Sequence, residues 1–186
     1  GNGIRLNWQR VQEEKRAVVK RLVRGIEFLL QRTGVEVLKG RADFRSQKEI
    51  IFRDSLGQRL FEADKIILAM GASSVDLPFL KANGKEVITH REALDLEEIP
   101  STMIIIGAGA VGLELGSIFA RLGTDVTILE IMSTILPGTD KQMALRLERL
   151  LKKQGLKIRT GVRLEEAILE GGKILLIIYE ITKITW

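Results

Sequence analysis

Residues 103–130 have the sequence MIIIGAGAVGLELGSIFARLGTDVTILE, and this stretch decides the fold. The apolar run Met103–Ile106 predicts a strand that enters a glycine-rich turn. An amphipathic helix follows the turn, and the β-branched run Val126–Leu129 predicts a second strand that ends on Glu130. Strand, glycine turn, helix and strand, closed by an acid, form the dinucleotide-binding fingerprint in its full context.

The three glycines of the turn have separate physical roles. Gly107 permits a tight turn after the strand, and Gly109 has no Cβ, which lets a pyrophosphate approach the backbone. Gly112 lets the helix lie close to the sheet. The unpaired N–H groups at the start of the helix favour an anion, so the loop needs no basic side chain.

Glu130 lies 18 residues after Gly112, at the end of the second strand. A carboxylate there can accept hydrogen bonds from a ribose 2′-OH and would repel a 2′-phosphate, so the sequence favours NAD over NADP. The alternative is a glycine-rich turn in an ordinary βαβ unit that binds no ligand. The strand before the turn, the helix after it and the acid at this distance together favour the dinucleotide site.

Composition sets the broad class of the protein. The chain has 186 residues, of which 45% are apolar, enough for one large domain or two small ones. No apolar run approaches the roughly 20 residues that cross a bilayer, and no signal-peptide pattern is present, so we expect a cytoplasmic protein without membrane contact. The sequence has no Cys, which excludes a disulfide framework, a thiolate metal site and cysteine redox chemistry within this chain.

The net charge of +5 comes from one end of the chain. Residues 1–40 hold nine Lys or Arg and four Asp or Glu, whereas the remaining 146 residues hold 20 of each. These charges surround the polar face of one helix without interleaved aromatic residues. We therefore expect a solvated helix face and no nucleic-acid partner.

The segments before the fingerprint predict a long helix and a small meander. Helical spacing of apolar residues predicts a helix over Leu6–Gln31, with Asn7 as N-cap and Gly34 as stop, whose Trp8 and leucine stripe serve as core or subunit contact. The near-continuous apolar run Lys65–Met70 predicts a buried strand that ends at Gly71. The runs expected to form the meander are Val35–Leu38, Arg41–Phe44, Glu49–Arg53 and Arg59–Phe61.

The remaining segments predict a linker and the rest of an α/β domain. Residues 85–101 are expected to form the linker, with a domain boundary near Pro100. The elements expected after Glu130 are a helix from Asp140, its N-cap, to Gln154, a third parallel strand over Leu156–Arg159, and a hairpin of Arg163–Ile168 and Lys173–Ile181. The fold class is thus α/β, with a Rossmann-type parallel sheet.

Several motifs in this order resemble the pyridine nucleotide disulfide oxidoreductases, and within that family the dihydrolipoamide dehydrogenases. Besides the fingerprint and the long helix, the motifs are KGRADF at Lys39–Phe44, ILAMGASSVDLP at Ile67–Pro78 and THREALDLEEIP at Thr89–Pro100. The resemblance covers nearly the whole chain. It implies a partial FAD-domain segment over residues 1–100 and an NAD-binding domain over residues 101–186, as a central part of such an enzyme.

The resemblance also implies roles for particular residues. The residues that would hold the NAD pyrophosphate are Gly107, Ala108, Gly109, Ala110, Val111 and Gly112. Glu114 would face the nicotinamide side, Glu130 would bind the adenosine ribose and Leu164 would lie beside the adenine. The positions that match FAD contacts are Ala42, Met70, Gly71 and Ala72, with Met70 in place of the usual Thr. For Glu114 the alternative is a carboxylate that only favours the helix dipole in the first turn.

The same resemblance implies what this chain lacks. In the family, electrons pass from dihydrolipoamide to a redox-active disulfide, to FAD and then to NAD, and the cysteines, the FAD fingerprint and the catalytic His lie outside the matched region. We therefore expect NAD as the cofactor of this chain, FAD only in an intact parent, and no catalytic or metal-binding residue. His90, the only His, is expected at the surface.

The resemblance leaves two classes of function open, part of an enzyme and a non-catalytic module. The chain is expected to be the NAD-binding part of a flavin-dependent oxidoreductase, whose parent belongs to a 2-oxo acid dehydrogenase complex. The alternatives are a non-catalytic dinucleotide-binding or assembly module, and part of a related NADH oxidase or ferredoxin reductase. A missing last strand and interface domain would leave apolar surface exposed, so we expect homo-oligomers.

Overall fold

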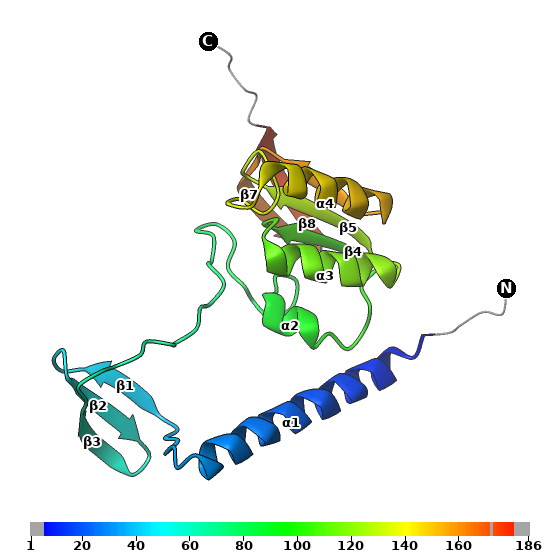
Figure 1. Ribbon diagram of the computed structural model, residues 1–186. Coiled ribbons are helices and arrows are strands. Elements are labelled where there is room, and N and C mark those ends of the chain that lie inside the picture. Colours follow the sequence, from blue (N-terminus) through cyan, green and yellow to red (C-terminus); the bar gives the residue numbers. More distant parts are fainter. Residues whose placement is uncertain (1–5, 172, 181–186) are drawn as a thin grey trace. The chain divides into compact units, whose positions relative to one another are not determined.

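The computed structural model describes residues 6–171 and 173–180 (Figure 1). They form two compact units. One unit, here called the fingerprint unit, contains the chain from Ser74 onward together with the residues before Arg10. The other, here called the meander unit, contains Arg10–Ser73. The two units are defined by the contacts within the chain. They do not test the predicted domain division near Pro100, which stays a prediction.

A parallel sheet forms the centre of the fingerprint unit. Its strands, in the order β4-β5-β6, are β4 Thr102–Ile106, β5 Asp125–Glu130 and β6 Lys157–Thr160. Helix α3, Ala110–Arg121, connects β4 to β5, and α4, Lys141–Lys153, connects β5 to β6. Strand β6 and helix α4 agree with the predicted bounds to within one residue, and α3 is the helix expected after the glycine turn. The α/β Rossmann-type class is therefore confirmed.

Three layers build this unit. Helix α3 contacts β4 and β5, and α4 contacts β6, while the antiparallel hairpin of β7, Val162–Glu170, and β8, Lys173–Glu180, meets the sheet through β5. Figure 1 shows the two helices in front of the parallel strands and the hairpin behind them. The hairpin predicted from the sequence is therefore present, except that Ile181 lies outside the described residues.

The core lies between the helices and the parallel sheet. Phe119 of α3 is 1% exposed, and Val126 and Ile128 of β5 are fully buried. Trp8 completes this core, since its indole N–H donates to the Leu96 carbonyl at 2.9 Å and its ring lies 6.4 Å from that of Phe119. The predicted structural role of Trp8 is thus confirmed.

The helix ends follow ordinary capping chemistry. Asp140 accepts hydrogen bonds from the N–H groups of Gln142 and Met143, both at 3.0 Å, which confirms it as the N-cap of α4. A short helix, α2 at His90–Leu94, lies within the segment predicted as a linker. Thr89 and Glu92 form a complete capping box at its start.

The meander unit contains most of a long helix and a three-stranded antiparallel sheet. Its elements are α1 Trp8–Arg32, β1 Arg41–Phe44, β2 Glu49–Asp54 and β3 Gly57–Glu62, in the sheet order β1-β2-β3. Phe52 is buried, and the centre of the Phe52 ring lies 5.1 Å from the Arg59 guanidinium. Helix α1 ends two residues before Gly34, whose φ of +72° suits the predicted stop.

Two predicted strands of the meander unit are wrong. Val35–Leu38 and Lys65–Met70 have no strand structure, and Ile67 and Met70 are 90% and 85% exposed. An apolar run forms a buried strand only where neighbouring strands pair with it, and in the described residues no ladder includes either run. The apolar stripe of α1 is also exposed, so its role as subunit contact stays a prediction.

Candidate dinucleotide-binding site

The glycine turn connects β4 to α3 at the carboxyl edge of the parallel sheet. Gly107 has a φ of +103°, a region that favours glycine, and its N–H donates to the Leu129 carbonyl at 2.8 Å. A Cβ on Gly112 would fall closer than 3.0 Å to the Gly107 carbonyl oxygen. The turn and the helix therefore approach each other as closely as glycine allows. The same Cβ would lie 3.2 Å from Ile105 Cγ2 of β4, which agrees with the close approach of helix and sheet predicted for Gly112.

The outer side of the turn is open to a ligand. A Cβ on Gly109 would have no heavy atom within 4 Å, and Gly109 and Ala110 are exposed. The first N–H groups of any helix have no intrahelical acceptor. Gly109, the N-cap of α3, offers them no side-chain acceptor either. Open space in front of these N–H groups fits an anion such as a pyrophosphate.

Glu130 lies at the end of β5 and is 6% exposed. One carboxylate oxygen, Oε2, accepts from the Ala108 N–H, and the other, Oε1, accepts from the Met132 N–H, both at 2.7 Å. Each carboxylate oxygen has two acceptor positions, so each retains one for a further donor such as a ribose hydroxyl. The acid predicted from its spacing is therefore bonded directly to the glycine turn.

The loop after β5 closes one side of the site. The Leu136 N–H donates to the Ala108 carbonyl at 2.9 Å, and the Gly161 N–H, between β6 and β7, donates to the Met132 carbonyl at 2.8 Å. Ile135 is fully buried and anchors this loop in the core. The ends of β4, β5 and β6 are thus connected at one edge of the sheet, where ligands of parallel sheets bind.

Glu114 is an exposed residue of α3 that lies beyond the first turn. Its interpretation as a carboxylate that stabilises the first turn is wrong, because the helix begins at Ala110 and the dipole effect falls off within one turn. Its role toward a nicotinamide stays a prediction. Leu164, the residue predicted beside the adenine, is half-buried in β7 and pairs with Ile178.

The residues matched to FAD contacts belong to the meander unit. Ala42 is an exposed residue of β1, and Met70, Gly71 and Ala72 are exposed in an irregular segment where Gly71 has a φ of +73°. They therefore lie in a different unit from the fingerprint residues. Their contact with a flavin stays a prediction.

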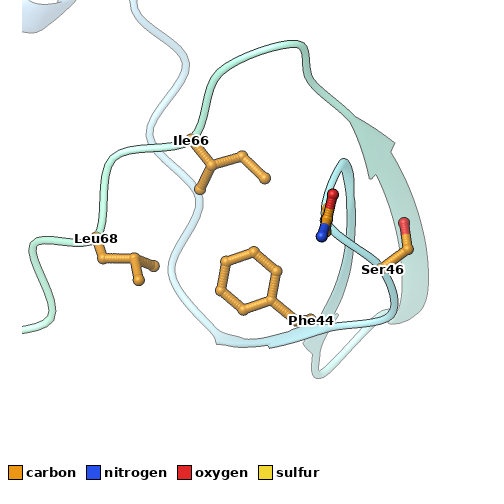
Figure 2. A pocket seen from close by; sticks show the side chains of 5 residues that line it. Phe44, Ser46, Ile66 and Leu68 are labelled. Carbon is orange, nitrogen blue, oxygen red and sulfur yellow. The ribbon is translucent and has the colours of Figure 1, made fainter.

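A hollow of about 480 Å³ also lies in the meander unit (Figure 2). Its lining residues are Phe44, Ser46, Gln47, Ile66 and Leu68. In Figure 2 the Phe44 ring and the Ile66 side chain point toward one another across it. None of the residues predicted to bind a cofactor lines this hollow.

Two further polar side chains, those of His90 and Glu92, form hydrogen bonds near the start of α2. His90 Nδ1 lies 3.1 Å from Ser74 Oγ, a pairing that the sequence did not predict. Hydrogen bonds from the Thr89 side chain and backbone lower the pKa of the Glu92 carboxyl below its ordinary value.

Across residues 6–171 and 173–180, no three His, Asp or Glu side chains are grouped as metal ligands. In that same part of the chain, no helix combines the length and apolar character needed to cross a membrane.

A family model supplies the decisive comparison. The model described as pyridine nucleotide-disulphide oxidoreductase matches residues 4–184. The chain belongs to this family. The resemblance inferred from the sequence motifs is thereby confirmed.

Curated relatives narrow the resemblance within the family. The dihydrolipoyl dehydrogenase of Bacillus subtilis is 34% identical over 161 residues, which cover 87% of this chain and 35% of the relative. That of Staphylococcus aureus is 36% identical over 164 residues, which cover 88% of this chain and 35% of the relative. The chain thus spans about a third of the length of these curated relatives.

Solved structures agree with the fold. LpdA from Mycobacterium tuberculosis matches with a TM-score of 0.82 at 23% identity, over 97% of this chain and 41% of that one. The HOCl-induced flavoprotein disulfide reductase RclA from Escherichia coli matches with a TM-score of 0.73 at 26% identity, over 92% of this chain and 39% of that one. The α/β architecture is therefore that of flavoprotein disulfide reductases.

Proposed function

We propose that this chain is the NAD(H)-binding part of a flavin-dependent oxidoreductase of the dihydrolipoamide dehydrogenase type. The observation that carries this proposal is Glu130, a buried carboxylate at the end of β5 that accepts a hydrogen bond from the glycine turn. It stands where an adenosine ribose would lie if a pyrophosphate occupied the open side of the turn. Family membership and the similarity to dihydrolipoyl dehydrogenases support the same assignment.

Each residue of the site has a separate task in this proposal. The backbone from Gly107 to Gly112 and the start of α3 bind the pyrophosphate, and Glu130 accepts the ribose hydroxyls and rejects a 2′-phosphate. Glu114 lies toward the nicotinamide and Leu164 beside the adenine. NAD, when bound, supplies the hydride-accepting ring, and this chain binds and orients it.

The chain holds NAD(H) and does not retain FAD in this proposal. A glycine fingerprint of the form GxGxxG occurs once in the sequence, at residues 107–112, and the proposal assigns it to NAD. The sequence also has no Cys, so this chain does not carry out dithiol oxidation through a disulfide. The donor dithiol and the 2-oxo acid dehydrogenase complex belong to the proposed parent enzyme, whereas this chain itself forms homo-oligomers through the exposed apolar face of α1.

A titration of NADH followed by its fluorescence tests the binding function. We expect saturable binding to the unmodified chain and clearly weaker binding to Glu130→Ala, because the variant removes the ribose acceptor. The absence of saturable binding to the unmodified chain would contradict the proposal. Equal binding by both proteins would contradict the role of Glu130.

A second candidate function is a non-catalytic dinucleotide-binding or assembly module. The lack of Cys, together with the engagement of the only His with Ser74, favours it. A colourless preparation that binds NADH would support this function. A yellow preparation that reduces dyes with NADH would refute it and would support a flavin-retaining member of the family, which includes a related NADH oxidase or ferredoxin reductase.

A further inference from the structure

The Glu130 carboxylate connects two segments that lie far apart in the sequence. It accepts from the N–H of Ala108, 22 residues earlier, and from the N–H of Met132, two residues later, both at 2.7 Å. Ala108 is fully buried and Glu130 is nearly so. Bonds this short between backbone N–H groups and an anionic acceptor are charge-assisted and about twice as strong as neutral ones.

The N–H and the carbonyl of Ala108 both form hydrogen bonds with residues 130–136. The carbonyl of Ala108 accepts from the Leu136 N–H at 2.9 Å, while its N–H donates to Glu130. Leu136 has a φ of +46°, a backbone conformation that a leucine adopts only where its surroundings hold it. The conformation of the glycine turn is therefore fixed by contacts with residues 130–136.

We propose that Glu130 is a positioning residue of the glycine turn, in addition to its direct contact with ribose. By holding the Ala108 N–H, the carboxylate fixes the direction in which the free N–H groups that begin α3 face a pyrophosphate. This inference rests on the proposed NAD(H)-binding function and deepens it. It has a consequence for cofactor choice, because a neutral residue at 130 removes the repulsion of a 2′-phosphate but also loosens the turn that binds the pyrophosphate.

The chemistry of the two bonds explains why a carboxylate is required. Both partners are N–H donors, and a carboxylate accepts at both of its oxygens. A carboxamide accepts at one oxygen only, and its NH₂ group would face an N–H donor. Glu130→Gln therefore keeps the size of the side chain and loses one of the two bonds.

Two ligands separate positioning from direct contact. ADP carries the diphosphate and both ribose hydroxyls, whereas 2′,3′-dideoxy-ADP carries the same base and diphosphate and lacks both hydroxyls. Calorimetric titration of both ligands should show that Glu130→Gln weakens dideoxy-ADP binding about tenfold, the order of magnitude of one lost hydrogen bond. Glu98→Gln removes an exposed carboxylate of the same unit and should leave both affinities unchanged. Equal binding of dideoxy-ADP by the unmodified chain and Glu130→Gln would overturn the positioning role.

Amide hydrogen exchange tests the same inference without a ligand. In NMR spectra of Glu130→Gln, the Ala108 or the Met132 amide, whichever loses its acceptor, should exchange about tenfold faster than in the unmodified chain and in Glu98→Gln. Unchanged exchange at both amides would overturn the inference. Failure of the unmodified chain to bind ADP would overturn the proposed function instead, and the exchange experiment would still decide whether Glu130 holds the turn.

Discussion

Substitution of Gly112 by Ala tests how closely α3 approaches the glycine turn. Within a helix, Gly→Ala normally stabilises by about 0.5–1 kcal/mol because it lowers the entropy of the unfolded chain. At Gly112 the new Cβ would fall closer than 3.0 Å to the Gly107 carbonyl oxygen and 3.2 Å from Ile105 Cγ2. A backbone oxygen cannot rotate away, so the clash requires the helix or the turn to move.

The magnitude of this effect follows from two opposed contributions. Overpacking costs about 1–3 kcal/mol, which exceeds the helix-propensity gain and leaves a net loss of about 0.5–2 kcal/mol. For a chain of this size the melting temperature should fall by about 1–8 °C. Thermal unfolding followed by circular dichroism without ligand measures this change.

Gly25→Ala supplies the matched control. Gly25 lies within α1, and a Cβ there would have no heavy atom within 4 Å. The same substitution in open space should stabilise α1 by about 0.5–1 kcal/mol, with the sign opposite to that at Gly112. A Gly112→Ala protein as stable as the unmodified chain would refute the close approach of helix and turn.

Three further predictions concern other elements. Asp140→Ala should destabilise the fingerprint unit by about 1 kcal/mol in urea unfolding, and Asp140→Asn should retain most of that stability. Because the folded pKa of Glu92 is depressed, its contribution to α2 is present above its unfolded pKa and is lost as pH falls through its folded pKa. The protection of the α2 amides, measured relative to their intrinsic exchange rates at each pH, should therefore fall at acid pH, and Thr89→Val should reduce this dependence. The exposed apolar face of α1 should cause self-association, which a monodisperse monomer in light scattering would contradict.

The sequence predicted those elements whose pattern and local chemistry agree. The expected strand Met103–Ile106 corresponds to β4, which begins one residue earlier, and Asp140 caps α4 as expected. The signature of α2 was also present, because Thr89 and Glu92 have the spacing of a capping box. The same segment has the length and position of a linker between two proposed domains, and the linker prediction does not include a helix.

The local sequence pattern could not predict which apolar runs are buried or which groups form hydrogen bonds with each other. Lys65–Met70 has the composition of a buried strand, yet a strand requires neighbours, and Ile67 is 90% exposed. The spacing of Glu130 from Gly112 predicted an acid at the site but gave no information about its bonds to Ala108 and Met132. Those bonds depend on how the ends of β4 and β5 meet in three dimensions.

The central claim is that the fingerprint unit binds NAD through the glycine turn and Glu130. Parallel calorimetric titrations of NAD and NADP into the unmodified chain test it most directly, since the two ligands differ only by the 2′-phosphate that Glu130 would repel. We predict saturable binding of NAD and at least about tenfold weaker binding of NADP, since one unfavourable charge contact costs on the order of 1.4 kcal/mol or more. No saturable binding of NAD, or equal affinity for the two dinucleotides, would contradict the account.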